Sequence, residues 1–120
     1  MIDREIKVIG FIGLGVMGCS MSKNLLKNKN WNVLVKDLNA NKEKELENQG
    51  AKIASDTREI FTLSDLVITC LPGGDFVKDL YFGRNKNISH IKINQVIIDM
   101  STSQPDLMIK LEHEITYLNQ

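Results

Sequence analysis

The sequence predicts an α/β fold built on a parallel sheet, and two observations support this prediction. First, short runs rich in β-branched and other apolar residues recur along the chain, which indicates strands buried on both faces. Second, segments with helical patterns separate these runs, and such alternation is typical of parallel sheets. The expected strands cover residues 6–13, 33–35, 52–54, 66–71 and 96–100.

Helices are expected between these strands, at residues 16–28, 41–49, 56–63 and 75–82, with a last one from 103 to about 118. Gly50 suits the C-terminal end of the second helix. Ser55 or Asp56 can cap the third helix, and Ser103 the last, because short polar side chains accept hydrogen bonds from free backbone N–H groups. Residues 83–94 are polar and receive no assignment.

A glycine-rich turn follows the first expected strand and opens the first helix. Its residues, G-x-G-x-x-G from 13 to 18, are Gly13, Leu14, Gly15, Val16, Met17 and Gly18. In this context Gly13 allows a tight turn, Gly15 lets a pyrophosphate approach the backbone, and Gly18 lets the helix pack closely on the sheet. The N–H groups of the helix would bind the phosphates. The motif therefore predicts a doubly wound, Rossmann-type sheet with a dinucleotide site; the alternative is a loop that needs glycine only for a positive φ.

Asp37 follows the second expected strand, 24 residues after Gly13. A carboxylate in this position can accept hydrogen bonds from the adenosine ribose of NAD, and it repels the additional phosphate of NADP. The next residue is Leu38, which offers no cation for that phosphate, and alternation along the strand should turn Lys36 to the opposite face. We therefore predict NAD as the cofactor, with NADP less favoured. In the alternative interpretation Asp37 only terminates the strand.

Three ordered blocks resemble the β-hydroxyacid dehydrogenases, a family that includes 3-hydroxyisobutyrate dehydrogenase and is related to 6-phosphogluconate dehydrogenase. The first block is F-I-G-L-G-V-M-G at 11–18, followed by Met21, Asn24 and Leu25. The second is S-D-L-V-I-T-C-L-P at 64–72, and the third is D-M-S-T at 99–102 with Pro105. Together they extend over nearly the whole chain.

The resemblance implies roles for individual residues. Residues 14–17 would lie along the pyrophosphate and the nicotinamide ribose, and Asp37 with Leu38 beside the adenine ribose. Leu71 and Pro72 would flank the cofactor, while Ser101 and Thr102 would bind the substrate carboxylate or the nicotinamide end. Such positions suit ligands that bind at the carboxyl ends of strands. Alternatively, Leu71 and Pro72 only end a strand, and Ser101 and Thr102 only form a turn.

The family's acid–base lysine lies in a G-x-x-G-x-G-x-x-x-K stretch of a helical second domain, and this sequence contains no such stretch. We therefore expect residues 1–120 to form the NAD(P)-binding domain of a longer enzyme, with the sheet truncated before its last strand or strands. By itself the chain is expected to carry no catalytic residue and to lack turnover. The parent enzyme would be a homo-oligomer, and this part of it could be monomeric.

Composition excludes several other classes. The chain has 120 residues, 15 basic and 15 acidic, so its formal net charge is +0, which argues against nucleic acid or an anionic membrane as partner. No apolar run is long enough for a membrane span. Cys19 and Cys70 lack metal-ligand spacing, so we predict no metal and two buried thiols. Met21, Met100 and Met108 are expected in the core, and the polar start favours a cytoplasmic protein over a mitochondrial one.

The predicted function is hydride transfer between NAD(P) and a short β-hydroxy acid such as 3-hydroxyisobutyrate, with this chain binding the cofactor. Two alternatives remain open. The chain could be a non-catalytic nucleotide-binding or sensing module, or part of an enzyme similar to 6-phosphogluconate dehydrogenase. A helical second half with its lysine would distinguish an enzyme from a sensing module.

Overall fold

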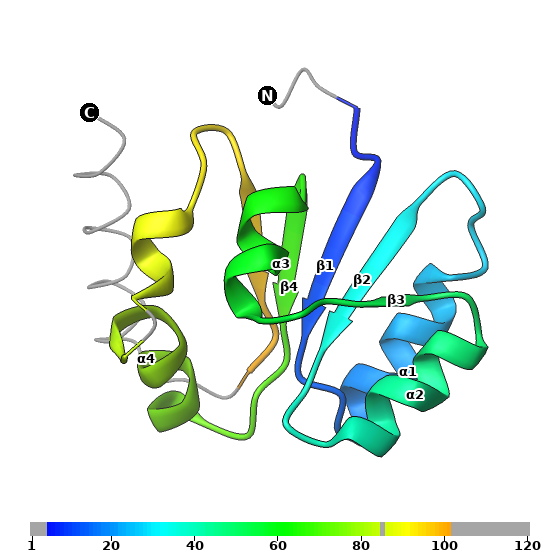
Figure 1. Cartoon of the computed structure of the whole chain (residues 1–120), viewed down its shortest axis with the longest axis horizontal. Coiled ribbons are helices and arrows are strands. Elements are labelled where there is room, and N and C mark those ends of the chain that lie inside the picture. Colours follow the sequence, from blue (N-terminus) through cyan, green and yellow to red (C-terminus); the bar gives the residue numbers. More distant parts are fainter. Residues whose placement is uncertain (1–4, 85, 102–120) are drawn as a thin grey trace.

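A computed structural model of the chain describes residues 5–84 and 86–101, shown in colour in Figure 1. Strands and helices alternate along this part of the chain. Their order is β1 (Val8–Ile12), α1 (Val16–Leu25), β2 (Asn32–Lys36), α2 (Ala40–Asn48), β3 (Lys52–Ile53), α3 (Thr57–Leu63), β4 (Leu66–Thr69), α4 (Gly74–Phe82), the 3₁₀ helix η1 (Asn87–His90) and β5 (Val96–Asp99).

The strands form one parallel sheet in the order β3-β2-β1-β4-β5. The chain builds outward from β1 through β2 to β3, then crosses β1 to continue with β4 and β5 on the other side. This reversal creates a switch point at the carboxyl ends of β1 and β4, where sheets of this type bind ligands. The predicted α/β, Rossmann-type fold is confirmed.

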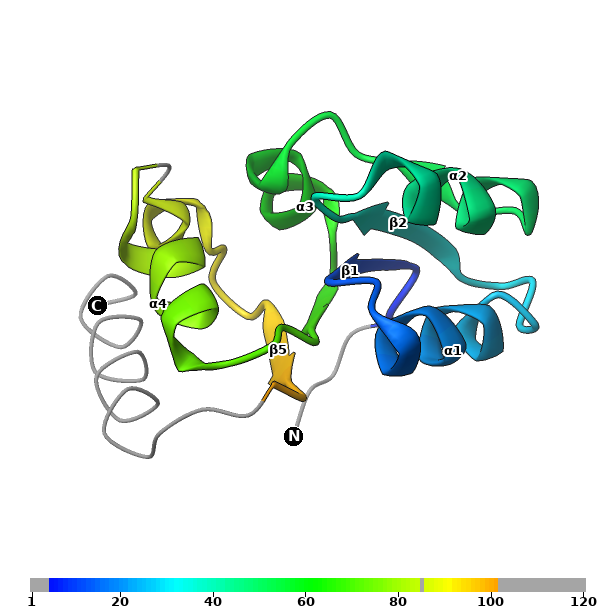
Figure 2. The ribbon, with the colours of Figure 1, turned by 90° about the horizontal axis from the view of Figure 1, so that it is seen from below.

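Alternation along the buried strands supplies two hydrophobic cores. In β1, Ile9 and Phe11 pack into one core with Cys19 of α1 and Leu46 of α2. Ile12 belongs to the other core, to which the helices contribute Ile60 and Phe61 of α3 and Val77, Leu80 and Tyr81 of α4. Figure 2 shows α1 and α3 on opposite sides of β1. Helices therefore cover both faces, as a doubly wound sheet requires.

Gly10 lets α3 approach the middle of β1 closely. A Cβ atom at this position would lie 2.6 Å from Cγ2 of Ile60 and closer still to Oγ of Ser64. We expect Gly10→Ala to lower the free energy of unfolding by about 1–3 kcal/mol, because the helix must move away from the strand. Urea unfolding measures the change. Gly73→Ala is the matched control, since its Cβ would meet nothing within 4 Å and should leave stability nearly unchanged; equal losses in both variants would contradict the expectation.

Several element boundaries differ from those predicted. The first strand begins at Val8 rather than at residue 6, and α1 ends at Leu25 rather than at 28. There the N–H groups of Lys27 and Asn28 bond to carbonyls three residues back, so the helix tightens and stops. The unassigned stretch contains η1, which Asn87 anchors by donating to the Leu80 carbonyl and to Oγ1 of Thr57, both at 2.8 Å.

Two predictions about the core are wrong in part. Met100 is 47% exposed rather than buried, because it follows β5, which pairs only with β4 within the described sheet. Cys19 is buried as predicted, whereas Cys70 is only half-buried. The predicted last helix, Met108 and Thr102 lie outside the described residues. In the described part, no helix is long and apolar enough to cross a membrane, and no cluster of His, Cys, Asp or Glu side chains could hold a metal ion.

Candidate functional site

The glycine turn follows β1 at the switch point, and backbone groups pack closely against its first and last glycines. Gly13 has φ +101°, a conformation that side chains disfavour, and its N–H donates to the Lys36 carbonyl at 3.0 Å. A Cβ atom on Gly13 would collide with the carbonyl oxygen of Cys70, and one on Gly18 would collide with the carbonyl oxygen of Gly13. Gly13 and Gly18 are therefore required by close backbone packing.

Gly15 differs from these two glycines because the fold itself does not need it. Its φ of −65° suits any residue, and a Cβ atom there would meet nothing within 4 Å. It is the N-cap residue of α1, and no side chain caps this N-terminus. The backbone N–H groups of the first turn thus face an open surface, and they favour an anion for their partial positive charge. Close packing therefore does not account for glycine at 15, as it does at 13 and 18.

Asp37 is bound back to the glycine turn. Its Oδ1 accepts the Leu14 N–H at 2.8 Å, and its Oδ2 accepts the Asn39 N–H at 2.9 Å. The two predicted parts of the site, 23 residues apart in sequence, are therefore in direct contact. Each carboxylate oxygen has a second lone pair, so both can still accept a ligand hydroxyl.

Glu43 of α2 is a buried carboxylate beside Asp37 that sequence reasoning missed. Its Oε2 accepts the Asp37 N–H at 3.1 Å and also pairs with Nζ of Lys36 at 3.2 Å. The sequence prediction placed Lys36 away from the site through strand alternation; in the structure an ion pair with Glu43 holds it. The polar residues at the end of β2 gave no indication that a helix residue six positions later would bind them.

Exposed apolar side chains surround the glycine turn and the end of β2. Val16 is 90% exposed, Met17 60% and Leu38 97%. Large apolar groups in water are informative when they gather at one place, because such patches often mark binding surfaces. Here they flank the open N-terminus of α1 and the Asp37 carboxylate, where the flat rings of a nucleotide could cover them.

The β4 and β5 ends bring the other predicted site residues together. Oγ of Ser101 accepts the Leu71 N–H at 2.6 Å, which joins the two segments 30 residues apart. Asp99 fixes this arrangement: its Oδ1 accepts the Ser101 N–H at 2.9 Å and the Thr69 hydroxyl at 2.8 Å. Leu71 is half-buried, and Pro72, which follows it, is exposed. The resemblance placed Asp99 in its motif without a role; the structure shows that it orders the turn.

Burial acts on three weakly acidic side chains of the described structure, Cys70, Tyr81 and Cys19. It raises the pKa of the Cys70 thiol, and the Asp99 charge raises it further. Burial also raises the pKa of the Tyr81 hydroxyl, again with a smaller contribution from Asp99. Cys19 likewise has a raised pKa, first through burial and then through the bond from its Sγ to Oε2 of Glu45 at 2.8 Å. All three groups stay protonated at neutral pH, so none of them is an activated nucleophile.

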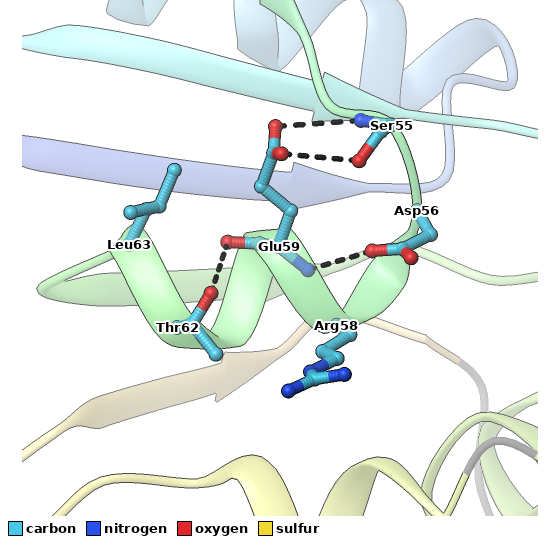
Figure 3. A pocket seen from close by; sticks show the side chains of 6 residues that line it. All are labelled: Ser55, Asp56, Arg58, Glu59, Thr62 and Leu63. Carbon is cyan, nitrogen blue, oxygen red and sulfur yellow. Dashed lines mark hydrogen bonds between the residues drawn. The ribbon is translucent and has the colours of Figure 1, made fainter.

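A hollow beside α3 lies outside this site. Ser55, Asp56, Arg58, Glu59, Thr62 and Leu63 line it (Figure 3). Its polar groups are used within the helix itself: Ser55 donates to Glu59, and Asp56 accepts the Glu59 N–H at 2.9 Å. This is a capping arrangement of the helix N-terminus, and it explains these residues without a ligand.

A glycine turn at the switch point, an open helix N-terminus and a carboxylate bound to that turn define a dinucleotide-binding domain of the Rossmann class. A family model described as the NAD binding domain of 6-phosphogluconate dehydrogenase matches residues 8–119. The chain belongs to this family, as the sequence resemblance indicated.

Curated relatives agree with this assignment. The chain is 36% identical over 99 residues to the probable mitochondrial 3-hydroxyisobutyrate dehydrogenase of Dictyostelium discoideum, and 37% identical over 97 residues to the 3-sulfolactaldehyde reductase of Escherichia coli K12. These alignments cover 82% and 81% of this chain but only 30% and 32% of the relatives. The chain thus spans about a third of the length of the curated relatives that it matches.

Solved structures show the same fold. A structure titled as Psf3 in complex with NADP+ and 2-OPP has a TM-score of 0.85 and 26% identity, and the match covers 92% of this chain and 39% of that one. The 3-hydroxyisobutyrate dehydrogenase of Mycobacterium tuberculosis, titled with L-serine, has a TM-score of 0.82 and 24% identity over 96% of this chain and 38% of that one.

Proposed function

We propose that this chain binds NAD(H) as the cofactor domain of an oxidoreductase acting on a short β-hydroxy acid. The observation that carries the proposal is the hydrogen bond between the Leu14 N–H and the Asp37 carboxylate, which joins a phosphate-binding turn to a ribose-binding group. The pyrophosphate would lie at Gly15 and the N-terminus of α1. The adenine ribose would lie at Asp37, with Leu38 against the adenine side.

The opposite end of the site would hold the nicotinamide and the substrate. The nicotinamide, when bound, supplies the hydride chemistry. Leu71 and Pro72 would support the ring, and Thr102 would complete this end of the site. Oγ of Ser101 already accepts one hydrogen bond, so its own proton can donate to a substrate carboxylate. The names of the relatives, 3-hydroxyisobutyrate dehydrogenase and 3-sulfolactaldehyde reductase, support a short substrate with an anionic group.

NAD is proposed over NADP because of the charge at the end of β2. A 2′-phosphate would meet the Asp37 carboxylate and the uncharged Leu38 side chain, and like charges at close range repel. A structural neighbour is titled with NADP+, so the fold itself does not exclude that cofactor. The preference proposed for this chain rests on its own residues at 37 and 38.

Calorimetric titration of the chain with NADH and NADPH tests the proposal. We expect the wild type to bind NADH more tightly than NADPH. Asp37→Ala should weaken NADH binding by about 10-fold to 100-fold, because charged hydrogen bonds contribute about 1.5–3 kcal/mol each and tenfold corresponds to about 1.4 kcal/mol.

Asp37→Asn is the matched control. It retains one acceptor oxygen for the Leu14 N–H but loses the charge, so it should weaken NADH binding less than Asp37→Ala does and lose much of the discrimination against NADPH. Tighter NADPH binding by the wild type would refute the cofactor preference. Binding of neither cofactor would refute the proposed function of the chain.

A further inference from the structure

Glu43 occupies a place in the cofactor site that its sequence position did not suggest. It lies in the first turn of α2, 6% exposed, with its carboxylate directed to the end of β2. A buried carboxylate needs partners, since removal from water disfavours its charge. Its Oε2 has two: the Asp37 N–H at 3.1 Å and the Lys36 ammonium at 3.2 Å.

One oxygen of Glu43 therefore binds both the backbone N–H of Asp37, the proposed ribose-binding residue, and the ammonium group of Lys36. The Lys36 ammonium lies beside the Asp37 backbone but is neutralised by Glu43. Its side chain is 26% exposed, so a flexible four-carbon stem would reach solvent if the pair were broken. The three charges at this strand end sum to −1, and the only positive one is already paired.

We infer that Glu43 determines cofactor specificity by withholding Lys36 from the ribose 2′ position. This inference rests on the proposed binding of the adenine ribose at Asp37. A lysine at the end of β2 would otherwise favour a 2′-phosphate. With Glu43 in place, the phosphate meets the Asp37 carboxylate and a lysine that is already paired, so NADPH is rejected by more than the Asp37 charge alone.

Glu43→Gln tests the inference directly. The amide still accepts the Asp37 N–H, but it no longer binds Lys36 as an ion pair. In calorimetric titrations of the 120-residue chain, the ratio of the NADPH to the NADH dissociation constant should fall by about threefold to fivefold, the size expected for one partly exposed ion pair. The difference in this ratio between Glu43→Gln and the wild type should become smaller at higher salt concentration, because salt screens exposed charges.

Two further variants assign the effect to Lys36. Glu47→Gln on the same helix removes a carboxylate paired with Lys44 at 2.8 Å, away from Asp37, and should leave the ratio unchanged. The double variant Glu43→Gln with Lys36→Met should have the ratio of the wild type again, because no lysine is left to bind the 2′-phosphate. If Glu43→Gln does not fold, Glu43→Met fills a similar volume and should give the same direction of shift.

The outcomes separate this inference from the proposed function. If the wild type prefers NADH but Glu43→Gln has an unchanged ratio, or weakens both cofactors equally, Glu43 has only a structural role and the inference is wrong. The inference is also refuted if the ratio of the NADPH to the NADH dissociation constant stays lowered in the double variant. If the wild type binds neither cofactor, the proposed function is wrong, and if it binds NADPH more tightly, the proposed cofactor preference is wrong. In both cases the inference about Glu43 is wrong as well.

Discussion

Gly15→Val is expected to abolish dinucleotide binding while leaving the fold intact. The backbone at 15 has an ordinary φ of −65°, and a Cβ atom would meet nothing within 4 Å, so the side chain projects into open space. In the proposed function, the pyrophosphate approaches the helix N–H groups through that space. We expect the NADH dissociation constant to rise by at least about 100-fold, since displacing a phosphate from such close contact removes several charged hydrogen bonds.

The measurement pairs calorimetric titration with urea unfolding of the same variant. Stability should change by no more than about 0.5 kcal/mol, as is usual for surface substitutions. Gly73→Ala is the control for stability, because its Cβ atom would be equally free of contacts and it lies outside the turn. Full NADH affinity in Gly15→Val would place the pyrophosphate elsewhere, and lost binding together with a large loss of stability would show that position 15 is structural.

Gly13→Ala is expected to have the opposite pattern, with a large loss of stability. Its φ of +101° is strained for alanine, and the new Cβ would collide with the Cys70 carbonyl at the end of the neighbouring strand. Unlike a flexible side chain, a backbone carbonyl in a sheet has little room to move. We expect the free energy of unfolding to fall by at least about 3 kcal/mol, from overpacking and backbone strain together.

Urea unfolding at a single temperature measures this loss, and NADH binding should disappear with it. Gly10→Ala provides the comparison, since its collisions are with side-chain atoms of Ile60 and Ser64 rather than with a backbone carbonyl. A Gly13→Ala domain as stable as the wild type would mean that the turn is looser than the structure shows. The pair of substitutions at 13 and 15 thus divides one motif into a position required by the fold and a position required by the ligand.

The sequence predicted the fold and the glycine turn well because both depend on local patterns. Strand–helix alternation determined the order of the elements, and G-x-G-x-x-G directly after an apolar run located the turn. The end of α1 and the helix η1 were not predictable in the same way. η1 depends on Asn87, whose amide bonds to Leu80 and Thr57, and a contact across 30 residues leaves no local pattern.

In the candidate site too, the sequence indicated individual residues but not the contacts between distant parts of the chain. Asp37 and Ser101 were predicted, but not that Asp37 binds the Leu14 N–H or that Ser101 binds the Leu71 N–H. Glu43 was hidden in a polar helix in which most other residues are exposed. Its burial follows from the close approach of α2 to the end of β2, which is a property of the packed structure. Met100 was misplaced because an apolar residue type alone does not show whether a strand lies at a sheet edge.

The bond between Asp37 and the glycine turn also affects the entropy of binding. A loop of glycine-flanked residues would ordinarily be disordered in the free protein, and a ligand would have to order it. Here the Leu14 N–H is already bound by a side chain from the neighbouring strand, at 2.8 Å. The conformational entropy of the turn is therefore lost when the protein folds rather than when the cofactor arrives. A cofactor bound as proposed would meet a site that is already ordered, so more of its contact energy would contribute to affinity.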